Sequence, residues 1–187
     1  MADIQEYKCP NCGGILTFEP GTQKMKCPYC DSEIDVQALA DADLDDVLKH
    51  WEGLGYYSRV RNLKKAAQVI CAEYQGSFPQ AYQQIRALPG IGDYTAGAIC
   101  SIAYDQKTPA VDGNVLRVIS RLTEDGTPID LPAYKKGVQS CLAEVYPENA
   151  GTFTQALMEL GATLCGPNWK PRCEECPCRS FCLGALH

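Results

Sequence analysis

The twelve residues LPGIGDYTAGAI, at positions 88–99, place a two-glycine turn between two apolar helical patterns. Glycines in such a turn allow positive φ angles and keep the backbone N–H groups unobstructed. N–H groups at the start of a helix form an anion site, which suits the phosphate of a DNA backbone. A two-glycine turn can also be an ordinary helix connection, but the full string is typical of a hairpin that binds DNA. The residues expected to contact DNA here are Gly90, Ile91 and Gly92.

Helical patterns extend on both sides of this turn. Apolar residues recur at helical spacing over most of the chain after residue 43, with Asp43 as a plausible N-cap of the first pattern. No convincing strand alternation follows residue 38, so we predict a mainly α body. The predicted helices lie near residues 44–51, 63–74, 81–88, 95–103, 115–122, 138–145 and 153–164.

The first part of the chain has a different character, with turn-forming residues, short apolar pieces and no helical period. The strings CPNC and CPYC form two C-x2-C knuckles separated by fourteen residues, with the thiols of Cys9, Cys12, Cys27 and Cys30. Two knuckles complete a tetrahedral S4 shell suited to zinc, although iron is a competing occupant. We therefore predict a small β zinc ribbon over residues 1–37, folded by its metal, with its binding partner left open.

A second group of four cysteines lies at the other end, in the pattern C-x7-C-x2-C-x5-C. A zinc site usually divides its ligands between two knuckles, whereas this uneven run suits thiolates around a [4Fe–4S] cluster, with zinc as the alternative. The cluster ligands expected here are Cys165, Cys173, Cys176 and Cys182. Of the remaining cysteines, three are predicted to be small buried hydrophobes and one a bystander beside the cluster, namely Cys71, Cys100, Cys141 and Cys178.

Composition sets outer bounds on the function. The 187 residues are 45% hydrophobic and 21% charged, as in a soluble globular protein, and no apolar run approaches about 18 residues. Twelve cysteines without a signal peptide indicate metal ligation in a reducing compartment. The net charge of −6 is not typical of a DNA-binding protein, but local basic groups occur at residues 59–65 and 117–121. We expect a cytoplasmic monomer that is not bound to a membrane.

The string VDGNV, residues 111–115, opens one of the predicted helices. Asp112 could simply cap this helix, because Asp is a preferred N-cap residue. Its carboxylate could instead face the sugar of an extruded nucleotide. Cleavage of an N-glycosidic bond builds positive charge on the deoxyribose, which a preplaced carboxylate stabilises. The cap alone would be the simpler interpretation, but the position of Asp112 after the hairpin favours the catalytic one.

Four strings occur together in one order: WEGLGYYSRVRNL at 51–63, the hairpin, the helix over 111–121 and the tail cysteines. With this order and spacing, residues 38–187 resemble the adenine DNA glycosylases of the MutY type, in the helix-hairpin-helix base-excision superfamily. The resemblance implies a helix-hairpin-helix helical domain with a [4Fe–4S] loop. It also implies repair of duplex DNA that carries adenine mispaired with guanine or 8-oxoguanine, in the bacterial nucleoid.

The same resemblance assigns roles to single residues. Asp112 becomes the catalytic aspartate, and Tyr94 lies in the active site where relatives of the endonuclease III type carry a Schiff-base lysine. A lyase for oxidised pyrimidines is therefore disfavoured. Tyr56 resembles a wedge inserted into the base stack, with packing at a helix start as its alternative, and Asn114 joins the DNA-binding residues.

One part of the family pattern is missing. In the family a glutamate protonates the adenine, and it lies in a motif of the form SEVMLQQT before the string that begins at Trp51. This chain has the ribbon in that place, and neither Glu52 nor the ribbon glutamates match the motif. We expect a truncated or rearranged enzyme with weak or no activity. The alternative is a DNA-binding module without catalysis.

Overall fold

The computed structural model describes residues 8–9, 11–19, 21–22 and 24–185, in two compact units. Unit 1 runs to Pro79 and includes Leu88–Gly90, whereas unit 2 comprises Gln80–Ala87 and the chain from Ile91 onward. Within the described residues, no helix has the length and apolar character needed to cross a membrane.

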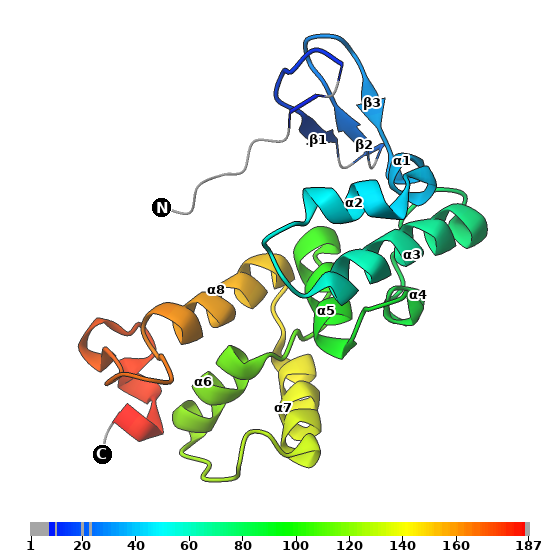
Figure 1. The fold of residues 1–187 in the computed structure, drawn as a ribbon. Helices are drawn as coiled ribbons and strands as arrows, with labels where there is room; N and C mark the ends of the chain where they lie inside the picture. Colours follow the sequence, from blue (N-terminus) through cyan, green and yellow to red (C-terminus); the bar gives the residue numbers. More distant parts are fainter. Residues whose placement is uncertain (1–7, 10, 20, 23, 186–187) are drawn as a thin grey trace. The chain divides into compact units, whose positions relative to one another are not determined.

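Unit 1 opens with a three-stranded antiparallel sheet in the order β1-β2-β3, which confirms the predicted small β unit (Figure 1). Short strands are expected here, because the segment alternates turn formers with only a few apolar residues. The backbone then passes directly from the sheet into helices. The elements of this unit are β1 (Thr17–Glu19), β2 (Lys24–Lys26), β3 (Glu33–Ile34), α1 (Val36–Asp41), α2 (Leu44–His50) and α3 (Tyr57–Tyr74).

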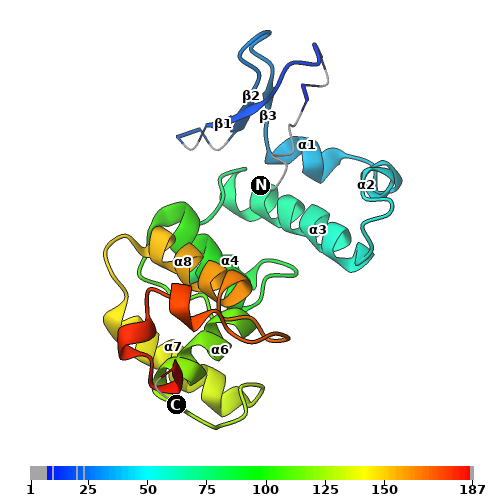
Figure 2. The same ribbon diagram turned by 90° about the vertical axis from the view of Figure 1, so that its left-hand side faces the viewer.

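Helices α1 and α2 both pack on α3, and two aspartates fix their starts. The Asp35 carboxylate accepts hydrogen bonds from the N–H groups of the first turn of α1, and Asp43 does the same for α2, as predicted. Helix α1 is not among the predicted helices, because its six residues are too few to show a period. Figure 2 shows α1 following the ribbon and lying beside α3.

Helix α3 begins six residues earlier than its predicted start at residue 63. Its N-cap is Tyr56, which has a left-handed backbone (φ 47, ψ 46) and no capping side-chain hydrogen bond. At the other end Gln75 and Gly76 both have positive φ, and the Gly76 N–H donates to the carbonyl of Ile70. This end is the predicted stop, because Gly readily takes the left-handed conformation.

Unit 2 is helical throughout its described part, as predicted. The predicted helix over 95–103 is not uniform, since its second half is a π-helical segment. Two contacts lie where the α-helix passes into the π-helical segment. Gly97 lies against the carbonyl of Pro109, and Ser101 Oγ donates to the Gly97 carbonyl at 2.8 Å. The elements are α4 (Tyr82–Ala87), α5 (Asp93–Ala98), η1 (Ile99–Ala103), α6 (Gly113–Thr123), α7 (Pro132–Val145), α8 (Ala150–Thr163) and the 3₁₀ turns η2 (Cys173–Glu175), η3 (Arg179–Phe181) and η4 (Leu183–Ala185).

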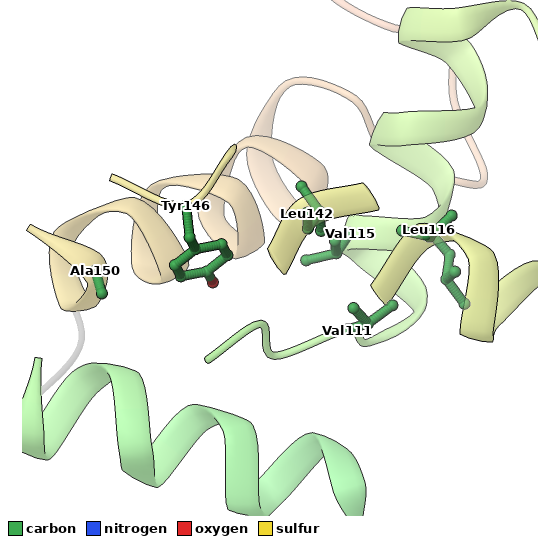
Figure 3. Close-up of a cluster of buried hydrophobic side chains, with 7 residues drawn as sticks. Val111, Val115, Leu116, Leu142, Tyr146 and Ala150 are labelled. Atoms are coloured by element: carbon green, nitrogen blue, oxygen red, sulfur yellow. The ribbon is translucent and has the colours of Figure 1, made fainter. Parts of the chain in front are cut away.

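The core of unit 2 joins the start of α6 to α7 and to the start of α8 (Figure 3). Each fully buried Val or Leu contributes about 1.5–3 kcal/mol. The ring of Tyr146 meets that of Phe153 edge-on at 5.0 Å, and its hydroxyl pairs with Thr154 Oγ1 at 2.6 Å. The core holds the first turn of α6 in place. Its buried residues are Val111, Val115, Leu116, Val138, Leu142, Tyr146 and Ala150.

Candidate functional site

The ribbon brings its four cysteines together at one point, with all four sulfurs within 4.8 Å of one another. Cys9 and Cys27 are buried, and the sulfur pairs Cys9–Cys30 and Cys12–Cys27 lie 3.6 and 3.4 Å apart. The Ser32 hydroxyl, 3.1 Å from the Cys30 sulfur, lowers the pKa of that thiol to about 6. The tight group of four thiols is compatible with binding a single metal ion.

The tail cysteines are arranged differently. They form no such tight group within the described chain, but all four predicted ligands line one cavity of about 130 Å³. Arg121, Arg172 and Arg179 also line this cavity, and Arg172 and Arg179 form ion pairs with Glu175 and Glu174. Four cysteines around one cavity fit a polynuclear cluster, with a single metal ion as the alternative.

The scattered cysteines follow the predictions in part. Cys178 does not line the cavity, in agreement with its expected role as a bystander. Cys100 is buried and Cys71 is half-buried. The prediction for Cys141 is wrong, because this residue is exposed. It lies on α7 and lines a groove together with residues of α6 such as Ile119.

The two glycines of the hairpin have different conformations. Gly90 has φ +80, and a Cβ there would lie 2.6 Å from Asn62 Cβ, so both backbone and space require glycine. Gly92 has φ −93 and ψ 175, an extended backbone open to any residue, and no atom lies within 4 Å of its Cβ position. Of the two glycines that allow a positive φ, only Gly90 uses it. This residue is instead the N-cap of α5, and its carbonyl accepts from Ala96.

An arginine that the sequence did not single out holds the hairpin. Arg86 Nε donates to Asp93 Oδ1 at 2.6 Å, and its Nη1 donates to the carbonyl of Ile91 at 2.9 Å. The Tyr82 hydroxyl donates to the same carboxylate at 3.3 Å. The hydrogen bond from Arg86 lowers the pKa of Asp93. One side chain thus joins α4, the turn and the first residue of α5.

Asp112 is the N-cap of α6, so the capping interpretation is confirmed. Its Oδ1 accepts from the Val115 N–H at 2.8 Å, and its Oδ2 accepts from Asn114 Nδ2 at 2.8 Å. The residue is half-buried, at the edge of the core of unit 2. Both oxygens are oriented by hydrogen bonds and the residue is not fully buried, so a catalytic role is compatible with this geometry.

The contacts of Asp112 continue to the tail through two arginines. Arg117 Nη2 donates to Asn114 Oδ1 at 2.8 Å, and its Nε donates to the Cys165 carbonyl at 2.8 Å. Arg121 Nη1 lies 3.0 Å from the same carbonyl and 3.1 Å from the Cys165 sulfur. The sequence alone indicates only a local basic group at these two arginines. The spacing 114, 117 and 121, which places side chains on one helix face, was the signal that could have revealed them.

The two tyrosines differ in their surroundings. Tyr94 lies on α5 and is 38% exposed, with its hydroxyl 3.9 Å from the Met158 sulfur. Tyr56 is 75% exposed, and the Arg59 guanidinium lies 4.9 Å from its ring centre. Tyr56 therefore contacts Arg59 at the helix start, while most of its ring faces solvent. The exposed part of the ring is available for contact with another molecule.

A family profile described as HhH-GPD superfamily base excision DNA repair protein matches residues 18–132. The chain belongs to this superfamily of helix-hairpin-helix DNA repair proteins. It is similar to the adenine DNA glycosylase of Mus musculus, with 44% identity over 149 residues that cover 79% of this chain and 29% of the mouse protein. It is also similar to the adenine DNA glycosylase of Buchnera aphidicola from Acyrthosiphon pisum, with 37% identity over 176 residues, 91% of this chain and 50% of the relative.

Solved structures share the fold. A thermostable thymine-DNA glycosylase superimposes with a TM-score of 0.72 at 28% identity, covering 81% of this chain and 70% of that one. A trapped endonuclease III–DNA complex superimposes with a TM-score of 0.68 at 23% identity over the same shares. The predicted mainly α fold of the helix-hairpin-helix glycosylases is confirmed. The chain spans half or less of the length of the two adenine DNA glycosylases named above.

Proposed function

We propose that this chain is the glycosylase part of an adenine DNA glycosylase. It would hydrolyse the bond between adenine and deoxyribose in duplex DNA where adenine is mispaired with guanine or 8-oxoguanine. The names of the relatives support the substrate, and the fixed carboxylate of Asp112 supports the reaction. We expect the protein to act on DNA as a monomer.

The chemistry follows from the surroundings of Asp112. As the N-glycosidic bond breaks, electrons leave with the base and the deoxyribose becomes positively charged. A carboxylate that the Val115 N–H and the Asn114 amide already orient stabilises this charge without reorganising. Water then forms a bond to the sugar carbon and loses one proton, and the departed base takes up one proton from solvent, so that the products are neutral adenine and an abasic sugar with a new hydroxyl group. Position 94 is a tyrosine, not the Schiff-base lysine that strand cleavage would need. We therefore expect hydrolysis without strand cleavage.

DNA would be bound at two places described above. The turn of Gly90, Ile91 and Gly92 presents backbone N–H groups to a phosphate, with Arg86 holding its shape. Tyr56 offers its exposed ring as a wedge between bases, and Asn114 adds an amide beside Asp112. Such contacts use backbone and shape rather than net charge, which is consistent with DNA binding by an acidic chain.

We assign a [4Fe–4S] cluster to Cys165, Cys173, Cys176 and Cys182, and Zn²⁺ to Cys9, Cys12, Cys27 and Cys30. The cavity lined by the four tail cysteines supports the first, and the tight group of four ribbon sulfurs supports the second. When bound, the cluster would join four points of the tail into one rigid loop. Zinc in the tail and iron in the ribbon are the alternatives, which metal analysis separates.

Base release is expected to be slow. Adenine leaves readily only when it is protonated, and no glutamate of this chain is assigned as the acid. General acid catalysis typically contributes about 10²–10⁴-fold to the rate. The single-turnover rate of this chain should therefore be lower than the rate of the mouse relative by about the same factor. A rate equal to that of the relative would show that another side chain supplies the proton.

Replacement of Asp112 tests the proposal. Asp112→Asn keeps a good N-cap acceptor for α6 but removes the charge. Single-turnover release of adenine opposite 8-oxoguanine should fall by at least about 10²-fold. Asp130→Asn, at an exposed carboxylate before α7, is the matched control and should change nothing. Wild-type protein that binds DNA but never releases adenine would instead identify the non-catalytic DNA-binding module.

A further inference from the structure

We propose that metal binding in the ribbon controls whether α1 is folded on α3, and through α3 controls the DNA-binding turn. The inference rests on the zinc assignment above and goes beyond it, because it gives the metal a regulatory effect on DNA binding. All the contacts that carry it lie within unit 1.

The first step is the contact between α1 and α3. Lys64 Nζ, from α3, donates to the Ala40 carbonyl at 2.7 Å, and Gln68 Nε2 reaches the same carbonyl at 3.4 Å. Ala40 itself is buried. At the other end of α1, Val36 lies 3.9 Å from the Cβ position of Gly76, just beyond α3. Helix α1 therefore packs on α3, and Lys64 binds its C-terminal end.

The second step is the dependence of α1 on the ribbon. A six-residue helix is far below the length of about 12–15 residues at which isolated helices become stable. Its N-cap, Asp35, directly follows strand β3, which pairs with β2. Ser32 places β3 relative to the metal site, because its hydroxyl contacts Cys30 and its carbonyl accepts from the Cys27 N–H at 2.9 Å. Without metal, the four thiols have no common partner and the strand pairing loses its support.

The third step leads from α3 to DNA. On another part of α3, Asn62 fills the space beside Gly90, with its Cβ 2.6 Å from where a Cβ of residue 90 would stand. Tyr56, the proposed wedge, caps the start of the same helix. A loss of α1 exposes the side of α3 that bears Lys64 and Gln68. Helix α3 then supports both DNA-contacting elements less firmly.

The experiment uses the full chain with its tail cluster intact, and compares Zn²⁺-loaded protein with protein in which Cys12 and Cys30 are changed to serine. Amide hydrogen exchange over 36–41 and 57–74 should become at least about tenfold faster in the variant. Binding to an undamaged duplex should weaken in parallel. Cobalt substitution of the wild type should give the visible absorption of a tetrahedral S4 site. Retained tail-cluster absorption shows that unit 2 has stayed folded.

A second pair of variants tests the link without touching the metal. Lys64→Ala removes the donor to the end of α1 and should speed exchange over 36–41 while cobalt absorption is unchanged. Lys65→Ala, at the next, exposed position of α3, is the matched control and should leave exchange as in the wild type.

The outcomes separate the claims. If the cobalt-substituted wild type shows S4 absorption but amide exchange over 36–41 and 57–74 is equal in all proteins, the link from metal to α1 and α3 is wrong. The zinc site and the glycosylase assignment would then still stand. Absence of S4 absorption overturns the coupling together with the zinc assignment. Neither result bears on base release at Asp112, which the substitution of that residue tests separately.

Discussion

At the scale of single residues, the two hairpin glycines show how different the demands on neighbouring positions can be. Gly90 combines a positive φ with a wall formed by Asn62, whereas Gly92 has an ordinary extended backbone and open space. Stability therefore depends on the first glycine. The second matters only if another molecule approaches its backbone.

Alanine at each position separates these roles. Gly90→Ala should lower the free energy of unfolding by about 1–3 kcal/mol, because it adds both backbone strain and a clash. Gly92→Ala should leave the unfolding free energy nearly unchanged but weaken DNA binding, since its methyl group would stand where a phosphate approaches. Denaturant unfolding and a duplex binding titration measure the two effects. Normal DNA binding by Gly92→Ala would argue against the phosphate site.

Single residues were predictable where a local rule applied. Asp112 was expected as a cap from its type and its place before a helix, and it is one. Arg117 was not recognised, because its partners Gly161 and Cys165 are more than forty positions away in sequence and only the fold brings them near. The glycine at position 161 lets α8 lie close to α6, since a Cβ there would be only 2.6 Å from Asn114 Cβ.

At the scale of elements, the hairpin is held by an ion pair between α4 and α5. Arg86 and Asp93 lie 2.6 Å apart, with side-chain exposures of 43% and 55%. Exposed pairs of this kind contribute little individually, and salt screens them. The pair nevertheless fixes geometry, because the same guanidinium also holds the Ile91 carbonyl.

The pH dependence of this pair has a definite sign. The pKa of Asp93 is lowered in the folded protein by its hydrogen bond from Arg86, so the folded state favours the charged form. The pair therefore stabilises the protein above the unfolded pKa of about 3.9, and this contribution is lost as the pH falls below it. Asp93→Asn should unfold at slightly lower denaturant than the wild type near neutral pH. The difference should shrink in acid and in high salt. A difference that grows toward acid would contradict the assignment.

Elements with long apolar stripes were predictable, and those that depend on neighbours were not. Helices α6, α7 and α8 follow their predicted periods, because their apolar faces form one core. Helix α1 escaped notice because it is short and needs Lys64 of α3 to satisfy its last carbonyls. The start of α3 at Tyr57 could not be predicted from the sequence. Its N-cap, Tyr56, has a left-handed backbone, and a tyrosine does not indicate that conformation.

At the scale of the whole molecule, the two cysteine groups serve different parts of the chain. The ribbon sulfurs belong to unit 1, and the tail sulfurs surround a cavity in unit 2. The sequence was sufficient to separate them, since spacing alone distinguishes two knuckles from a single run. It could not show that Arg121 reaches a tail sulfur, because that contact forms only when α6 passes beside the tail.

Arg121 should govern how firmly the tail holds the proposed cluster. Its guanidinium donates to both the carbonyl and the sulfur of Cys165, so Arg121→Gln removes hydrogen bonds to a proposed ligand. Bleaching of the visible absorption under a chelator should become faster by the order of tenfold. Arg179→Gln is the control, because that side chain lines the same cavity but pairs with exposed Glu174. Equal bleaching rates for the two variants would refute a special role of Arg121.

The exposed thiol of Cys141 has a practical consequence. It lies outside both groups of four, whereas Cys100 is buried and Cys71 and Cys178 are half-buried. Once metals occupy the two groups, a maleimide fluorophore should attach to Cys141 on α7. The unaltered sequence thus offers an attachment point for single-molecule tracking along DNA, with no engineered cysteine.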